Sequence, residues 1–256
     1  MVKKVLMLHG YAQNANIFSK RMRALRNACG KDVEFVFIDA PHVLVPVDFA
    51  DAFRAKPGTS SLSDSGAQGT STDSDSDPAL APRYWWNLKA DPAARSKTIG
   101  VEDSILLLRD VLSKDHYDGI LGFSQGAAMA ALVAALLEKP NLYPPFLIDG
   151  KPPHPPVTFC VAAAGFRPMS PLFDSILLPT YSTPTLHILG RTDVIVVEER
   201  SKQLLEVSTN KRVEWHHGGH FIPPRANRNI IKACLEDPLG EILSPHRSLR
   251  QERRHP

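Results

Sequence analysis

The chain has 256 residues, of which 43% are hydrophobic and 22% are charged, and its formal net charge is +3. This length and composition are typical of a globular protein with one large domain or two small ones, and they exclude global disorder. Residues 244–256 hold four arginines and one glutamate, so the rest of the chain carries 26 basic and 26 acidic residues. A neutral body argues against a nucleic-acid partner.

Strand and helix patterns alternate along the chain. Short apolar runs predict six strands, at residues 5–8, 34–38, 119–122, 157–163, 185–189 and 212–216. Amphipathic or small-residue patterns predict helices at residues 15–28, 99–112, 125–137, 198–207 and 226–235. This alternation predicts an α/β fold in which helices cover both faces of a mostly parallel central sheet.

Three segments interrupt this pattern. In residues 57–82, Gly, Pro, Ser, Thr and Asp occupy 20 of 26 positions, which predicts a disordered insertion near a lid. Residues 140–156 are rich in proline and predict a surface excursion between a helix and the next strand. Residues 238–256 predict a basic, flexible tail. Strand patterns continue on both sides of the two internal segments, so we expect one domain over residues 1–237.

Apolar runs are too short for a leader or a membrane span. A secretory signal contains a run of roughly 7–15 apolar residues, and the N-terminus has no such run. The apolar run at residues 127–137 is shorter than the roughly 20 residues that cross a bilayer. The three cysteines are too few and too scattered for a disulfide framework. We therefore expect a protein without a membrane span, located in the cytoplasm, with the nucleus as an alternative.

A G-x-S-x-G motif carries the chemistry. Gly122, Ser124 and Gly126 lie between an apolar strand pattern and a long helix pattern rich in small residues. In this context the serine stands on a sharp, strained turn from strand to helix, and the glycines leave room for the turn. The serine hydroxyl is then held at a helix N-terminus, which favours developing negative charge. We interpret Ser124 as a nucleophile.

A nucleophilic serine needs a base and an orienting acid. Asp193 follows the predicted fifth strand, so it lies at the same sheet edge as Ser124, and we favour it over Glu198 and Glu199 in the next helix. His220 follows two glycines and is the preferred base, with His217 as the alternative.

The same histidines could in principle bind a metal, because His216 and His220 are four residues apart. The Gly-Gly between them disfavours a helix, and no carboxylate or cysteine cluster joins them, so we expect neither a metal nor a cofactor.

The oxyanion hole needs two backbone N–H donors. We expect one from Gln125, directly after the nucleophile, and one from Tyr11, or from Ala12, in the glycine-containing loop after the first strand. In that loop His9 is expected to brace the backbone through hydrogen bonds rather than to take part in catalysis.

Three consecutive aromatic residues, Tyr84, Trp85 and Trp86, follow the predicted insertion. They are candidates for an acyl pocket beside Ser124, or for an anchor that packs into the core. The sequence leaves both interpretations open.

Together these segments resemble the family of serine hydrolases (FSH), an α/β-hydrolase group of fungi and animals that includes an ovarian-cancer-associated hydrolase and polyketide-releasing thioesterases. The resemblance runs from about residue 2 to residue 236, and its motifs are LHGYAQN at 8–14, DAPH at 39–42, YWW at 84–86, GFSQG at 122–126, GRTD at 190–193 and GGHFIP at 218–223. It implies an α/β-hydrolase fold, an esterase or thioesterase activity without a cofactor, and a triad of Ser124, Asp193 and His220. The segment at 57–82 departs from the family pattern.

We therefore predict a serine hydrolase that cleaves carboxylic esters of small molecules through an acyl-enzyme. One alternative is a thioesterase that releases an acyl or polyketide chain from a carrier or from CoA, with the same residues and a different leaving group. Another is a binding module that has the hydrolase fold but no catalysis.

Overall fold

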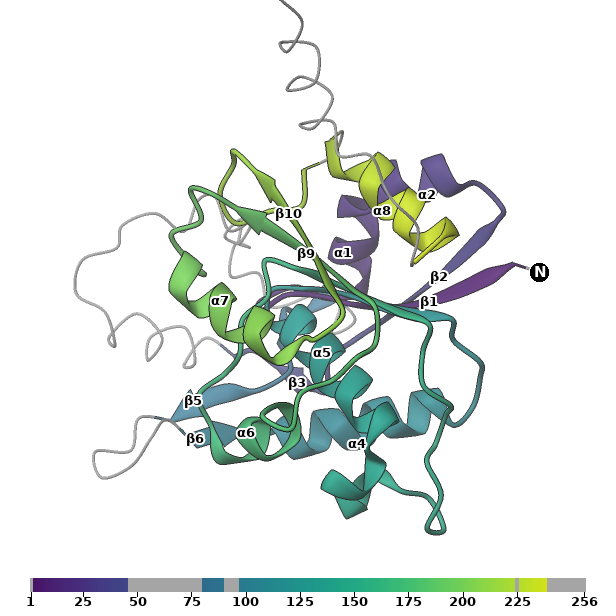
Figure 1. Ribbon diagram of the computed structural model, residues 1–256, viewed down its shortest axis with the longest axis vertical. Helices are drawn as coiled ribbons and strands as arrows, with labels where there is room; N and C mark the ends of the chain where they lie inside the picture. The colour runs from purple at the N-terminus through teal and green to yellow at the C-terminus, as the bar shows by residue number, and fades with distance from the viewer. Residues whose placement is uncertain (1, 46–79, 90–96, 224–225, 239–256) are drawn as a thin grey trace, which may run out of the picture.

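A computed structural model describes residues 2–45, 80–89, 97–223 and 226–238 (Figure 1). The predicted insertion at 57–82 lies outside the described residues except for its last three positions, and the predicted tail at 238–256 lies outside them except for Pro238. The domain boundary at residue 237 stays a prediction.

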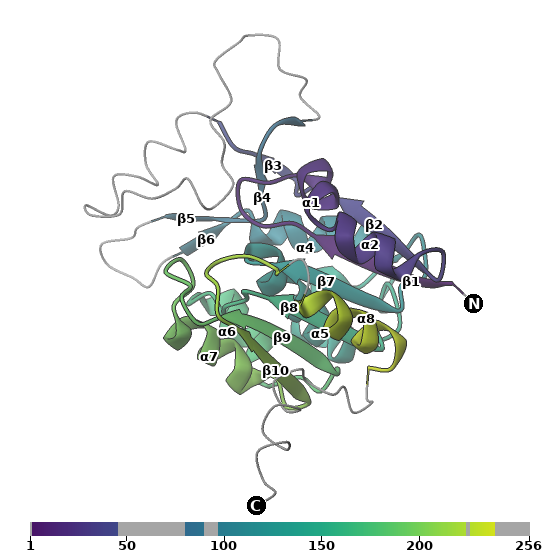
Figure 2. The ribbon, with the colours of Figure 1, turned by 90° about the horizontal axis from the view of Figure 1, so that it is seen from above.

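The centre of the fold is a six-stranded parallel sheet with the order β10-β9-β8-β7-β1-β2 (Figure 2). Its strands are β1 (Lys3–Leu8), β2 (Val33–Ile38), β7 (Gly119–Phe123), β8 (Phe159–Ala163), β9 (Thr185–Gly190) and β10 (Lys211–His216). All six predicted strands are confirmed. The central strands β7 and β8 are buried at every position, as expected for a parallel sheet covered on both faces.

Helices form a layer on each face of the sheet (Figures 1 and 2). One face carries α1 (Ala15–Arg21), α2 (Arg23–Cys29) and α8 (Ala226–Glu236). The other carries α4 (Val101–Leu112), α5 (Gln125–Glu138), α6 (Pro171–Leu177) and α7 (Glu198–Val207). Alternate residues of the strands pack into two separate apolar clusters, one beneath each layer. The sheet therefore separates two hydrophobic cores.

The structure differs from the predicted elements in two ways. The helix expected at 15–28 is divided into α1 and α2 at Met22, where ψ is 5°, although hydrogen bonds from Met22 N to Phe18 O and from Arg26 N to Met22 O span the break. Helix α6 and four short strands were not predicted, because each is too short to show a period. The four strands are β3 (His42–Val43), β4 (Arg83–Tyr84), β5 (Asn87–Lys89) and β6 (Lys97–Ile99).

The proline-rich excursion is partly built into the fold. It forms two single turns of 3-10 helix, η2 (Pro140–Leu142) and η3 (Pro144–Phe146). The Phe146 side chain is buried in the core, and the buried His154 ring accepts a hydrogen bond from Tyr117 N at 2.9 Å. The other residues of the segment are exposed or half-buried, and these two side chains anchor it.

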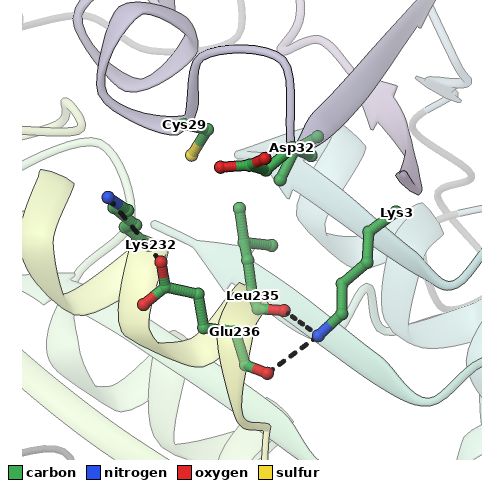
Figure 3. Close-up of a pocket in the computed structure, with 7 residues that line it drawn as sticks. Lys3, Cys29, Asp32, Lys232, Leu235 and Glu236 are labelled. Carbon is green, nitrogen blue, oxygen red and sulfur yellow. Dashed lines mark hydrogen bonds and ion pairs between the residues drawn. The ribbon is translucent and has the colours of Figure 1, made fainter. Parts of the chain in front are cut away.

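A pocket of about 220 Å³ lies at the amino ends of β1 and β2 (Figure 3). The Lys3 ammonium donates hydrogen bonds to the carbonyls of Leu235 and Glu236 at 2.6 and 2.8 Å, and so caps the end of α8. Because strand starts and strand ends lie at opposite edges of a parallel sheet, this pocket is remote from Ser124, which follows β7. We interpret the pocket as part of the packing of α8 against the sheet.

His187 makes the stability of this fold sensitive to acid. Its ring lies in β9 beside Ala162 and Val213, it is 1% exposed, and among the described residues its Nε2 has no hydrogen-bond partner. Burial, helped by Lys211, lowers the pKa of His187 from its ordinary 6.5 to about 3. The unfolded chain therefore binds a proton below pH 6.5 that the folded chain excludes, and the free energy of unfolding falls as the pH drops from 6.5 toward 3.

We expect His187→Leu to remove the contribution of this side chain to the pH dependence of the free energy of unfolding, while approximately preserving the side-chain volume. Wild type should lose about 2 kcal/mol more than the variant between pH 7.5 and pH 5, because one pKa unit corresponds to about 1.4 kcal/mol. Urea unfolding at the two pH values measures the difference. An identical pH dependence in both proteins would contradict the assignment.

Candidate active site

Ser124 stands on a sharp turn between β7 and α5. Its backbone has φ 55° and ψ −116°, a region that a residue with a side chain rarely adopts. The glycines on either side are required by close contacts. A Cβ on Gly122 would lie 2.1 Å from the Gly126 carbonyl oxygen, and a Cβ on Gly126 would lie 2.1 Å from the oxygen of Leu8. The turn predicted from the G-x-S-x-G motif is thus present, and Ser124 N ties it to β8 through Ala163 O at 2.9 Å.

His220 connects the serine to the acid. Its Nε2 lies 2.9 Å from Ser124 Oγ, and its Nδ1 lies 2.7 Å from Asp193 Oδ2. The carboxylate can only accept, so Nδ1 donates to it, and Nε2 of the neutral ring accepts from the serine hydroxyl. The imidazole also packs on Phe123, with the ring centres 5.0 Å apart. The structure therefore brings together the three residues that the sequence selects.

Asp193 is held by its own loop. Its Oδ1 accepts hydrogen bonds from the backbone N–H groups of Ile195 and Val196 at 2.9 and 2.8 Å, so Oδ2 is the oxygen that faces His220. These two N–H donors fix the orientation of the carboxylate, which is buried.

The loops that carry acid and base are in direct backbone contact. Asp193 follows β9 and His220 follows β10, the neighbouring strand. A Cβ on Gly190 would lie 2.3 Å from the Gly219 carbonyl oxygen, and Thr192 N donates to Gly218 O at 3.2 Å. Gly190 at the end of β9 and Gly219 before His220 therefore allow the two loops to meet.

The alternative histidines occupy other positions. His216 is buried at the end of β10, where its Nδ1 accepts from Gly218 N at 3.2 Å, and burial lowers the pKa of its ring. The nitrogens that contact Ser124 Oγ and Asp193 Oδ2 belong to His220 and not to His217, the fallback base. Within residues 2–45, 80–89, 97–223 and 226–238, no cluster of three or more His, Cys, Asp or Glu side chains has the arrangement of a metal site.

The loop after β1 runs beside the serine. A Cβ on Gly10 would lie 2.8 Å from the Phe123 ring and 3.4 Å from Ser124 Cβ. The Gly10 carbonyl accepts hydrogen bonds from His9 Nδ1 at 2.8 Å and from Gln13 N at 3.2 Å. In a trans peptide the N–H points away from the carbonyl, so these bonds fix the direction of the Tyr11 N–H. Gln125 is the first residue of α5, where an N–H has no acceptor within the helix.

His9 braces this loop, as the sequence predicts. Its Nδ1 donates to Gly10 O, and its Nε2 accepts from Ala40 N at 3.0 Å. The ring is fully buried, and desolvation lowers its pKa to about 4. The imidazole therefore stays neutral, as a hydrogen-bonding spacer, throughout the physiological pH range.

The three consecutive aromatics behave mainly as an anchor. Trp85 and Trp86 are 0% and 1% exposed, and the Trp86 ring packs against Phe166 and Phe173 at 6.1 and 5.1 Å. Tyr84 is half-buried and stacks on His42 at 5.1 Å. Burial of both tryptophans favours the packing interpretation over a pocket lining.

The sequence analysis missed the Gln125 side chain. Its amide is buried and bonds to the backbone of both tryptophans. The Oε1 atom accepts a hydrogen bond from Trp85 N at 3.0 Å, and Nε2 donates one to Trp86 O at 2.8 Å. An amide directly after the nucleophile, at the start of an otherwise apolar helix, is the signal that could have revealed it. This clamp joins α5 to a segment 40 residues earlier in the chain.

Comparison with known proteins places the chain in a family. A family model described as serine hydrolase (FSH1) matches residues 1–230. The chain belongs to this family. Among the relatives of this serine hydrolase, Esterase OVCA2 of Danio rerio is 35% identical over 231 residues, which cover 86% of this chain and 90% of the relative. An esterase of Aedes aegypti is 31% identical over 230 residues, covering 88% and 72% of the two chains.

Solved structures show the same fold at low identity. The crystal structure of Zea mays acyl-protein thioesterase 2 superposes with a TM-score of 0.60 and 18% identity, covering 93% of this chain and 94% of that one. The serine hydrolase therefore has the α/β-hydrolase fold. None of its described helices combines the length and the apolar character that a bilayer crossing requires.

The backbone strain at Ser124 is measurable. We expect Ser124→Gly to be more stable than Ser124→Ala by about 1 kcal/mol, because glycine adopts a positive φ without steric cost. Ser175, an exposed position within α6, is the matched control, and there the glycine variant should be the less stable by a similar amount. Urea unfolding of the four variants measures both differences. A less stable glycine at both positions would disprove the strain.

Proposed function

We propose that this serine hydrolase cleaves carboxylic esters through an acyl-enzyme on Ser124, with His220 as general base and Asp193 as its orienting acid. The observation that carries the proposal is the His220 ring, whose two nitrogens lie within hydrogen-bonding distance of Ser124 Oγ and Asp193 Oδ2. This is the geometry in which an imidazole can remove the hydroxyl proton and share the resulting charge with a carboxylate.

Acylation begins when Ser124 Oγ attacks the ester carbonyl carbon and His220 Nε2 takes the hydroxyl proton. The tetrahedral intermediate carries its negative charge on the former carbonyl oxygen, which accepts hydrogen bonds from the Gln125 and Tyr11 N–H groups. His220 then gives its proton to the departing alkoxide, and the alcohol leaves. Asp193 Oδ2 stabilises the imidazolium through the bond to Nδ1.

Deacylation repeats these steps with water as the nucleophile. His220 Nε2 takes a proton from the water, the same two N–H groups hold the second oxyanion, and the proton returns to Ser124 Oγ as the acid leaves. Each step uses only side chains and backbone groups of this chain.

Exposed apolar side chains follow Asp193 and His220 in the chain. Val194, Ile195 and Val197 follow Asp193 and are 76%, 42% and 41% exposed, and Phe221, which follows His220, is 43% exposed. Exposed apolar groups beside acid and base favour an uncharged, apolar acyl or alkyl group over a charged one. We therefore propose apolar acyl esters as the substrate class.

Replacement of the nucleophile tests the reaction. We expect Ser124→Ala to lower kcat for an aryl ester at least about 10⁴-fold and to abolish covalent labelling by a fluorophosphonate, because it removes the hydroxyl that His220 Nε2 contacts. Intact mass spectrometry should show one adduct on wild type and none on the variant. Undiminished hydrolysis by Ser124→Ala would overturn the assignment, and a folded wild type without an adduct would favour a non-catalytic binding module.

Matched substrates distinguish the enzyme's preference for the leaving group from its preference for the acyl group. An oxygen ester and a thioester of the same acid, compared by kcat/KM, distinguish an esterase from a thioesterase that releases carrier-bound or CoA-bound chains. Within the oxygen esters we expect Val194→Ser to lower kcat/KM for an octanoyl ester and to leave the acetyl ester unchanged, because the lost contact is apolar. An equal loss on both esters would contradict a role of this side chain in acyl binding.

A further inference from the structure

Trp85 contacts both residues that lie at the two sides of the oxyanion site. Its indole Nε1 donates to the His9 carbonyl oxygen at 2.8 Å, and its backbone N–H donates to Gln125 Oε1 at 3.0 Å. His9 immediately precedes the Gly10–Tyr11 peptide, and Gln125 bears the other expected N–H donor. A single fully buried residue thus touches the loop after β1 and the start of α5.

The bond to the His9 carbonyl fixes a peptide plane. The C=O of the His9–Gly10 peptide is held by Trp85, and its N–H is held by Gln13 Oε1 at 3.2 Å. The next peptide is then held at its carbonyl by the His9 ring, as described above. Rotation of either plane would turn the Tyr11 N–H away, because the two peptides share the Gly10 Cα and glycine permits almost any φ and ψ.

The same carbonyl lies directly against the nucleophile turn. A Cβ on Gly126 would be 2.5 Å from the His9 oxygen, so no side chain of α5 separates the loop from the helix. Here the indole N–H is the hydrogen-bond donor that meets this oxygen. The distance between the two expected oxyanion donors therefore depends on how this one carbonyl is oriented.

Trp85 itself has little freedom to move. Its carbonyl accepts a hydrogen bond from Ser104 Oγ on α4, and its ring lies 5.4 Å from the His9 ring. Gln125 Nε2 holds the following carbonyl, that of Trp86. Both polar backbone groups of Trp85 are thus hydrogen-bonded to helices, the N–H to Gln125 on α5 and the carbonyl to Ser104 on α4.

We propose that Trp85 is a positioning residue for ester hydrolysis, because it holds the Tyr11 N–H and the Gln125 N–H at the separation that a tetrahedral oxyanion requires. This inference rests on the proposed function, since it gives the two N–H groups their role. Trp85 acts through the peptide planes and does not touch the substrate. Its removal should therefore raise the barrier to oxyanion formation and leave substrate binding intact.

The test compares Trp85→Phe with Trp86→Phe. The first variant loses the indole N–H, which leaves the His9 carbonyl without its donor. The second variant replaces an equally buried indole by the same phenyl ring. Among the described residues, however, no hydrogen bond of the Trp86 indole is found. We expect Trp85→Phe to lower kcat about tenfold or more with KM changed less than about twofold, and Trp86→Phe to keep kcat within about twofold of wild type.

A second readout separates positioning from a general loss of structure. An aryl ester and its thiono counterpart differ only in the atom that enters the oxyanion hole, and sulfur accepts hydrogen bonds from N–H groups poorly. Wild type should prefer the oxygen ester strongly, and Trp85→Phe should reduce this preference about tenfold, whereas Trp86→Phe should retain it. Labelling of Ser124 by a fluorophosphonate in all three proteins shows that the nucleophile itself is intact.

The outcomes are separable. Wild-type kcat and an unchanged oxygen-to-thiono ratio in Trp85→Phe would overturn the inference, and so would equal losses in the two tryptophan variants. If Trp85→Phe does not fold, Gln125→Met tests the other end of the link, because it removes the bonds to Trp85 N and Trp86 O and should give the same selective loss. A failure of the proposed function would appear differently, as an active Ser124→Ala.

Discussion

The close crossing of β1, β7 and α5 is the constraint on which the rest of the molecule depends. Helix α5 can begin directly after Ser124 only because Gly126 lets its first turn approach the carbonyls of Leu8 and His9. That approach accompanies the positive φ of Ser124, whose hydroxyl lies at the end of the sheet against His220. It also brings the loop after β1 close to Ser124. One packing contact thus sets the position of Ser124 and of the loop beside it.

Asp193 and His220 are positioned by a different principle. They come from adjacent strands, and their loops meet through backbone groups, with Gly190 against Gly219 and Thr192 N on Gly218 O. Backbone contacts of this kind lose no side-chain entropy when they form. The two N–H groups that hold Asp193 Oδ1 belong to the same loop. The pair is therefore a local structure that needs only the correct order of two strands.

The sequence predicts the parts of this site that are local in the chain. Ser124, Asp193 and His220 each sit in a short motif directly after a strand, so the parallel order of the sheet is enough to bring them together. The two glycines before His220 favour it over His217, and the hydrogen bond between His220 and Ser124 agrees with this preference.

Long-range contacts could not be predicted in this way. The Gln125 clamp joins residues 40 positions apart, and the bond from Trp85 to His9 spans 76. Nothing in the local pattern at 84–86 distinguishes a buried anchor from a pocket wall, because both call for aromatic residues. The short strands β3 to β6 are likewise defined by their partners and not by a period of their own.

Strands β3 and β4 have a consequence for how this protein can change over evolutionary time. His42 pairs with Tyr84 and Val43 with Arg83, and Leu44 N donates to Pro82 O at 2.8 Å, so residues 44 and 82 lie side by side. Because β3 and β4 hold each other, the position of Trp85 does not depend on how many residues separate the two strands in the sequence. Evolving lineages can therefore gain or lose residues between β3 and β4 while Trp85, which directly follows β4, keeps its place.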